Sequence, residues 1–188
     1  GEACDEYPFR SKVGDSVTAV TPAVCGNRIL LVAGRGSGAA CVELDSAGRF
    51  HEAWRDRRAL DSLFNTLVVA DDAVFGFTSS RQGAASLRRV EFATGRVAWD
   101  HASELERGQA LAVGETLLVV GEQGHLAALA VDREAPRVLW RSAEPLLAAP
   151  CYSAPAYAEG LLVVRNETTV VAWSVRGQPK SVISVLTK

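Results

Sequence analysis

The residue types able to do chemistry are few in this chain, and they are scattered. The three histidines are His51, His101 and His125, and no two of them stand at metal-ligand spacing. No serine lies in a GxSxG motif, the turn that exposes a serine nucleophile. The carboxylate pair Asp71-Asp72 falls in a predicted hairpin turn, where short acidic side chains bond local backbone groups. We therefore assign no catalytic, cofactor-binding or metal-binding residue and no cofactor, and the pattern favours binding over catalysis.

The four cysteines are Cys4, Cys25, Cys41 and Cys151. They form no CxxC pair, which counts against structural zinc and against a thioredoxin-like motif. We expect single buried thiols. A disulfide that uses Cys4 stays open as an alternative if the protein is exported.

A glycine-rich segment, residues 34–38, reads Gly-Arg-Gly-Ser-Gly and has the composition of a phosphate-binding loop. It lies between two predicted strands, and no helix follows whose N-terminus would face an anion. The pattern favours a loop between strands, with a ligand-facing loop as the alternative.

The elements that carry these residues repeat about every 43 residues. Hairpin turns are predicted at Asn27, Asp72, Glu115 and Gly160, at intervals of 45, 43 and 45 residues. Short apolar strands precede the turns (22–24, 67–69, 111–113, 155–157) and follow them (29–32, 74–77, 117–120, 161–164). Third strands are predicted at 41–44, 87–92, 126–131 and 170–175, and a fourth strand ends each repeat. Four strands per repeat predict an all-β β-propeller of four consecutive four-stranded antiparallel blades.

The predicted organisation is a lead-in segment at 1–16 and a propeller portion at 17–188, with blades at about 17–56, 63–101, 108–141 and 149–188. We expect Tyr7-Pro8-Phe9 to pack on the first blade. Trp54, Trp99 and Trp140 close the fourth strands of three blades, and we expect a structural role for them, with Trp99 and Trp140 buried between neighbouring blades. The fourth blade has no such tryptophan in its outer strand, predicted at 182–186, and Trp173 on its third strand is expected in the core.

The composition narrows the function classes. The net charge of −2 argues against a nucleic-acid partner, and hydrophobic residues at 48% suffice for a buried core. No apolar stretch is long enough for a transmembrane helix. The chain contains no methionine, which suggests a processed product or a fragment, and the absence of a signal peptide is therefore uninformative.

Several stretches resemble a known repeat. Residues 90–99 (Val-Glu-Phe-Ala-Thr-Gly-Arg-Val-Ala-Trp) resemble the unit of the pyrroloquinoline-quinone-like (PQQ-like) propeller superfamily, in which a Thr-Gly turn precedes an outer strand that closes on tryptophan. Residues 124–129 resemble its third strand, and 154–166 and 21–24 its opening hairpin. The resemblance covers about residues 17–175 and is greatest to bacterial BamB-like proteins of the planctomycete type.

The resemblance implies a ring of seven or eight blades, of which this chain looks like the C-terminal half. The other half is then missing or separate, or two chains complete a ring. Quinoprotein dehydrogenases of the superfamily hold the quinone and calcium at the ring centre and carry a vicinal cysteine pair. This chain has no adjacent cysteines, and no cofactor ligand maps onto it.

We therefore expect a non-catalytic scaffold or protein-binding module, placed by the resemblance in the periplasm or cell envelope. One alternative is part of a quinoprotein-type or other small-ligand enzyme whose cofactor residues lie outside this chain. Another is a structural subunit of a larger complex. Two apolar faces should stay open, around 20–24 and 29–32 in blade one and at 161–164 and 170–173 in blade four. A protein partner or a second copy would then complete the propeller.

Overall fold

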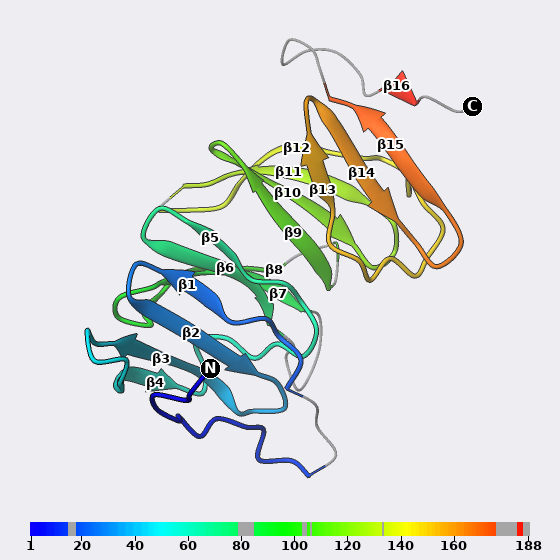
Figure 1. Cartoon of the computed structure of the whole chain (residues 1–188). Helices are drawn as coiled ribbons and strands as arrows, with labels where there is room; N and C mark the ends of the chain where they lie inside the picture. The colour runs from blue at the N-terminus through cyan, green and yellow to red at the C-terminus, as the bar shows by residue number, and fades with distance from the viewer. Residues whose placement is uncertain are drawn as a thin grey trace.

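The prediction of an all-β chain is confirmed. The computed structural model describes residues 1–14, 18–78, 85–102, 105, 107–132, 134–175 and 184–185. Within these residues there are sixteen β-strands and no helix. The strands form four antiparallel four-stranded sheets, and each sheet joins four strands in the order of the chain. Figure 1 shows the sheets side by side in a row, with the first and the fourth at opposite ends.

Each sheet is one blade. Blade one contains β1 (Ala23–Cys25), β2 (Arg28–Ala33), β3 (Gly38–Leu44) and β4 (Phe50–Asp56). Blade two contains β5 (Val68–Ala70), β6 (Ala73–Thr78), β7 (Ser86–Glu91) and β8 (Val97–Ala102). Blade three contains β9 (Gly108–Val113), β10 (Thr116–Gly121), β11 (Leu126–Ala130) and β12 (Arg137–Arg141). Blade four contains β13 (Ala156–Ala158), β14 (Leu161–Arg165), β15 (Val170–Ser174) and β16 (Ser184–Val185).

The predicted hairpin turns join the first two strands of every blade. Tight turns of this kind need residues with positive φ, supplied by Gly26, Asp71, Gly114 and Glu159 at 51–62°. The next residue in each blade accepts a backbone hydrogen bond at 2.8–2.9 Å from a residue at the end of the third strand. The four acceptor carbonyls belong to Asn27, Asp72, Glu115 and Gly160, and the donors are Leu44, Phe92, Val131 and Val175. One bond thus recurs at the same place in all four blades and fixes three strands of each.

The blades pack face to face through three apolar clusters. Blades one and two share a cluster that includes Leu30 and Phe92, and blades two and three share one that includes Phe75 and Leu117. The third cluster, around Trp173, joins blades three and four, so the expected place of Trp173 in the core is confirmed. The middle blades bury both faces of their sheets, because side chains alternate between the faces. This explains the continuous apolar runs of their central strands.

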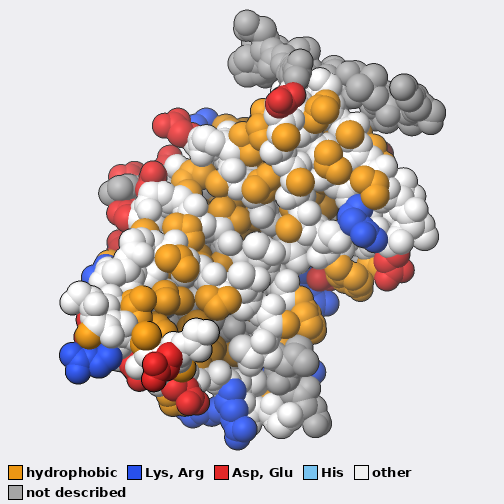
Figure 2. All heavy atoms as spheres, in the orientation of Figure 1, with side chains coloured by type: hydrophobic (Ala, Val, Ile, Leu, Met, Phe, Trp, Pro, Cys, Tyr) orange, Lys and Arg blue, Asp and Glu red, His pale blue; other side chains and the backbone are white. Residues whose placement is uncertain are grey.

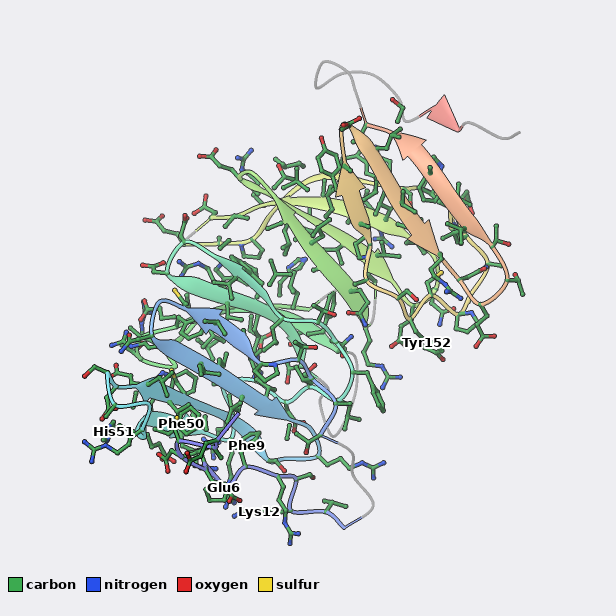
Figure 3. All side chains as sticks on the ribbon, viewed as in Figure 1. Glu6, Phe9, Lys12, Phe50, His51 and Tyr152 are labelled. Atoms are coloured by element: carbon green, nitrogen blue, oxygen red, sulfur yellow. The ribbon has the colours of Figure 1, made fainter. Side chains whose placement is uncertain are left out.

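Residues 4–12, which we call the N-terminal strap, lie on the end of the row formed by blade one (Figure 3). The Asp5 carboxylate accepts a hydrogen bond from the Phe50 backbone N–H at 2.8 Å, and the Tyr7 hydroxyl donates to Glu52. The Arg55 guanidinium lies 5.7 Å from the ring centres of both Tyr7 and Phe9. The expected packing of the Tyr7 segment on blade one is therefore confirmed.

The strap covers the face of blade one that points away from blade two. Trp54 faces blade two, so Arg55, its neighbour along the strand, points to the opposite side. Ala40 pairs with Arg55 and with Leu31, so both share that side; Ala40 is buried and Leu31 half-buried. The expectation of a broad open apolar face on blade one is wrong for the area around Leu31 and Ala40, because the strap covers it. Val24, on the innermost strand, stays exposed.

Candidate functional site

Trp54 and Trp99 each reach from the fourth strand of one blade to the next blade. Trp54 Nε1 donates to the Phe92 carbonyl at 2.9 Å, and Trp99 Nε1 donates to the Asp132 carbonyl at 3.0 Å. Trp99 is buried and packs against Phe75 with ring centres 5.7 Å apart. We propose that this contact, an apolar ring with a satisfied N–H, closes blades one and two against their neighbours.

Trp140 differs from these two, and the prediction that it is buried is wrong. It lies on β12 at the same place in the repeat, yet it is 40% exposed, and all five residues of β12 are exposed. The carbonyls that accept from Trp54 and Trp99 follow the third strand of the next blade. The equivalent place in blade four is at residues 175–176, and the structure describes only the first of these two. Trp140 therefore lacks, among the described residues, the cover that its counterparts have.

The residues that could do chemistry remain apart in the structure. His51 lies on the outer strand of blade one (Figure 3), where its Nε2 is 3.0 Å from Asp45 Oδ2. His125 Nδ1 is 3.4 Å from the hydroxyl of Ser142, in blade three. Among the described residues, no three His, Cys, Asp or Glu side chains come together as a metal site would require.

The glycine-rich loop lies between β2 and β3, as expected. Its Gly36 backbone N–H donates to Asp61 Oδ2 at 2.7 Å, so a carboxylate of the chain itself occupies the place where a phosphate oxygen would bind. Gly34 packs so closely on Leu63 that an added Cβ would lie 2.5 Å from it. The loop is thus held against the linker into blade two.

All four cysteines are free thiols. Cys41 and Cys151 are buried, as expected, whereas Cys4 is exposed and Cys25 half-buried. Burial raises the pKa of the Cys41 thiol to about 11 and also raises the pKa of Cys151. These two thiols are inert core residues at neutral pH.

The open surface lies on blade four. Its alternate residues Leu162, Val164 and Trp173 face blade three and are buried. The residues between them form what we call the blade-four face, which points away from blade three: Ala156, Ala158, Leu161, Val163, Val170 and Ala172. Val170 is 66% exposed, Leu161 is also exposed, and Figure 2 shows hydrophobic side chains gathered over this blade. The expectation of an open apolar face on blade four is confirmed.

This face can bind another sheet or an apolar segment of a protein. It carries small and β-branched side chains, which are the kind that pack between sheets in the interior of the row. Its one charged side chain from β14 is Arg165, at the end of the strand. The described part of the chain contains no helix with the length and hydropathy needed to cross a membrane.

No curated protein matches the chain in sequence. Among solved structures, BamB from Moraxella catarrhalis is 15% identical over 84% of this chain, with a TM-score of 0.54, and the chain spans 61% of its length. The computationally designed Ika4 protein is 13% identical over 93% of this chain and 99% of its own, with a TM-score of 0.60. The quinohemoprotein alcohol dehydrogenase ADHIIG from Pseudomonas putida HK5 is 14% identical over 85% of this chain and 29% of its own, with a TM-score of 0.55. At these identities the likeness shows the fold alone.

The family comparison covers the second half of the chain. Residues 83–178 match the family model described as outer membrane protein assembly factor BamB. They include the third and fourth strands of blade two, all of blade three, and β13, β14 and β15 of blade four. Because the match spans more than half of the 188 residues, the chain belongs to the BamB family of propeller proteins.

Proposed function

We propose that this chain is a non-catalytic propeller scaffold of the cell envelope, and that a partner polypeptide docks a β-sheet on the blade-four face. The observation that carries the proposal is the difference between the two ends of the row. The strap covers the outer side of blade one, whereas the blade-four face is open and apolar. Exposed patches of this kind on a folded chain mark an interface.

The face continues a series of contacts already present in the molecule. Each of the three internal contacts joins the apolar faces of two sheets, and their core residues are almost fully buried. The blade-four face offers the same kind of side chains without a described neighbour. A further sheet would extend the series without a new type of contact. That the chain spans 61% of the Moraxella catarrhalis BamB structure supports an assembly with more sheets than these four.

A separate polypeptide fits better than a second copy placed head to tail. Head-to-tail pairing would bring the blade-four face of one copy against the outer side of blade one of the other. That side already holds the strap, tied by Asp5 to Phe50 and by Tyr7 to Glu52. A second copy would have to displace these contacts first.

The non-catalytic part of the proposal rests on what the open face carries. Apart from Arg165 and Ser174 at the strand ends, its side chains are alanine, valine and leucine, and the register places no carboxylate, histidine or cysteine among them. The family supports the proposed placement in the cell envelope, because its description names an outer membrane assembly factor. The likeness to an alcohol dehydrogenase is one of fold and adds nothing about activity.

Photo-crosslinking in the source cells tests the docking site. p-Benzoyl-phenylalanine replaces Val170 on the blade-four face or, as a control, Val138, an exposed valine on β12 of blade three. We expect a single adduct from position 170, mapped by mass spectrometry to a β-strand of one partner, and no such adduct from position 138. An adduct with a second copy, or the same adducts from both positions, would overturn the proposal.

The purified partner then gives the quantitative test. Val170→Asp places a charge on the exposed apolar face and should weaken binding at least about tenfold, because a charge buried in an apolar contact is costly. Val138→Asp should leave the affinity unchanged. Equal affinities for Val170→Asp and the unmodified chain would show that the partner binds elsewhere.

A further inference from the structure

A cavity of about 470 Å³ lies where the chain enters blades two, three and four. Phe64 and Asn65 come from the linker into β5, Arg107 and Gln109 from the start of β9, and Tyr152 from the linker into β13. Figure 3 shows Tyr152 at the end of blade four, close to the lower end of β9. The cavity lies on one end of the innermost strands and is separate from the blade-four face.

The polar floor of the cavity is a fixed part of the fold. Buried Gln109 accepts a hydrogen bond from the Thr66 backbone N–H at 2.8 Å and donates one to the Tyr152 carbonyl at 3.0 Å. Buried Asn65 donates to the Gly108 carbonyl at 2.5 Å. Each of these bonds spans 43 residues, so each joins equivalent positions of successive blades. The amide groups are thus occupied by the backbone, and the floor does not require a polar ligand.

The walls of the cavity are two exposed aromatic rings. Phe64 is 65% exposed and Tyr152 is 60% exposed, although their chain neighbours Asn65 and Cys151 are buried. Rings this exposed lie outside the apolar core and do not fill it. Aromatic side chains at the edge of a concave site supply large contact area to a ligand at little cost in conformational entropy.

The charges at the rim balance each other. Arg107 Nε lies 3.3 Å from Glu122 Oε1, and both residues line the cavity. Because the cation is paired with an anion, the pair carries no net positive charge that would attract a phosphate or a carboxylate. The pair does present donors and acceptors beside the rings, which suits the amide groups that flank an aromatic side chain in a peptide.

We propose that this cavity binds a neutral aromatic ring, held between Phe64 and Tyr152. The volume lies within the usual range for small-ligand sites, about 300–1,000 Å³. The ring can belong to a free aromatic molecule or to a tryptophan side chain of a peptide, and the experiment below distinguishes these sources. The proposal does not depend on a partner at the blade-four face.

Fluorine NMR on the full chain tests it with two probes: N-acetyl-5-fluoro-tryptophanamide, and a pentapeptide with 5-fluoro-tryptophan between two alanines on each side. We expect saturable broadening of the fluorine signal for at least one probe. Tighter binding of the pentapeptide assigns a peptide as the source, and equal binding of both probes assigns a free aromatic molecule. Absence of saturable binding for both probes would overturn the proposal.

Variants assign the binding to the cavity. Phe64→Ala and Tyr152→Ala should each weaken binding about tenfold, whereas Tyr152→Phe should keep it, because the ring and not the hydroxyl makes the contact. Tyr157→Ala is the matched control, since Tyr157 is an exposed tyrosine on β13 outside the cavity. Val170→Asp should also leave ring binding unchanged, which separates this site from the proposed partner surface. If Phe64→Ala and Tyr152→Ala bind the probes as the unmodified chain does, with circular dichroism unchanged, the site is elsewhere.

Discussion

The indole ring of Trp54 lies directly on the α-carbon of Gly95. A Cβ added at Gly95 would stand 2.7 Å from Trp54 Cε3, closer than such atoms approach in folded proteins. The indole N–H of the same tryptophan donates to the Phe92 carbonyl at 2.9 Å. The outer strand of blade one is thereby joined to the turn between β7 and β8 of blade two. Gly95 is required twice, for this close approach and for its φ of +75°.

Gly95→Ala should destabilise the chain more than Gly114→Ala does. Gly114 also has positive φ, at +57°, but nothing lies within 4 Å of its added Cβ. We expect a loss of about 1 kcal/mol for Gly114→Ala from backbone strain alone. Gly95→Ala adds the clash with the indole and should cost about 2–4 kcal/mol. Urea denaturation of both variants measures the difference, and equal losses would show that the ring moves aside freely.

Trp99→Ala and Trp140→Ala should differ in the same assay. Trp99 is buried in the cluster between blades two and three and bonds Asp132, so its removal should cost about 3–5 kcal/mol. Trp140 is 40% exposed, so its removal should cost no more than about 1–2 kcal/mol. A loss for Trp140→Ala as large as that for Trp99→Ala would mean that Trp140 is covered in solution.

Acid should release the strap. The Asp5 carboxyl has a lowered pKa because it accepts backbone hydrogen bonds from Phe50 and Glu6, and Arg55 with Tyr7 lowers the pKa of Glu52. Because both pKa values are lowered, the charged carboxylates stabilise the bound strap at any pH above their ordinary pKa values of 3.8 and 4.5. This contribution is lost as the pH falls below those values, through the lowered pKa of each group.

The NMR signal of the Phe50 amide reports the release, since that N–H donates to Asp5. We expect the signal to be constant between about pH 5 and 8 and to shift below about pH 4. Asp5→Asn should remove the Asp5 part of this shift. Release of the strap between pH 5 and 8 would show that other groups hold it.

The four thiols should react with iodoacetamide in the order of their exposure. Cys4 is exposed and should react first at pH 8, followed by half-buried Cys25. Buried Cys41, with its pKa raised to about 11, and Cys151 should stay unmodified until the chain is unfolded. Peptide mapping by mass spectrometry gives the order. Early modification of Cys41 would contradict its place between blades one and two.

The four-blade architecture is predictable because one local pattern repeats. A residue with positive φ, a turn residue and an apolar strand recur at Asn27, Asp72, Glu115 and Gly160, and the same backbone bond forms at each. Strand ends differ from the prediction by a few residues, as in β9, which begins at Gly108 rather than at residue 111. Such ends depend on pairing with the neighbouring strand and not on the apolar pattern alone.

The surfaces are harder to predict because they depend on residues far apart in the chain. Tyr7 and Phe9 belong to no repeat, and their place on blade one depends on Arg55, more than 40 residues away. Trp140 has the repeat position of Trp54 but lacks its cover. The ring-lined cavity needs Phe64 and Tyr152 from linkers of two different blades, joined by Gln109. No local pattern shows that these linkers meet.

The strap on blade one also limits how copies of this chain can associate with one another. A sheet stack with two bare ends can add copies indefinitely, because a head-to-tail contact that does not close into a ring grows into a filament. Here the Asp5 and Tyr7 contacts close one end, so a copy that joins through blade four presents no bare end of the same kind to the next. We therefore expect association through blade four to stop after one addition, because the strap covers the other end of each copy.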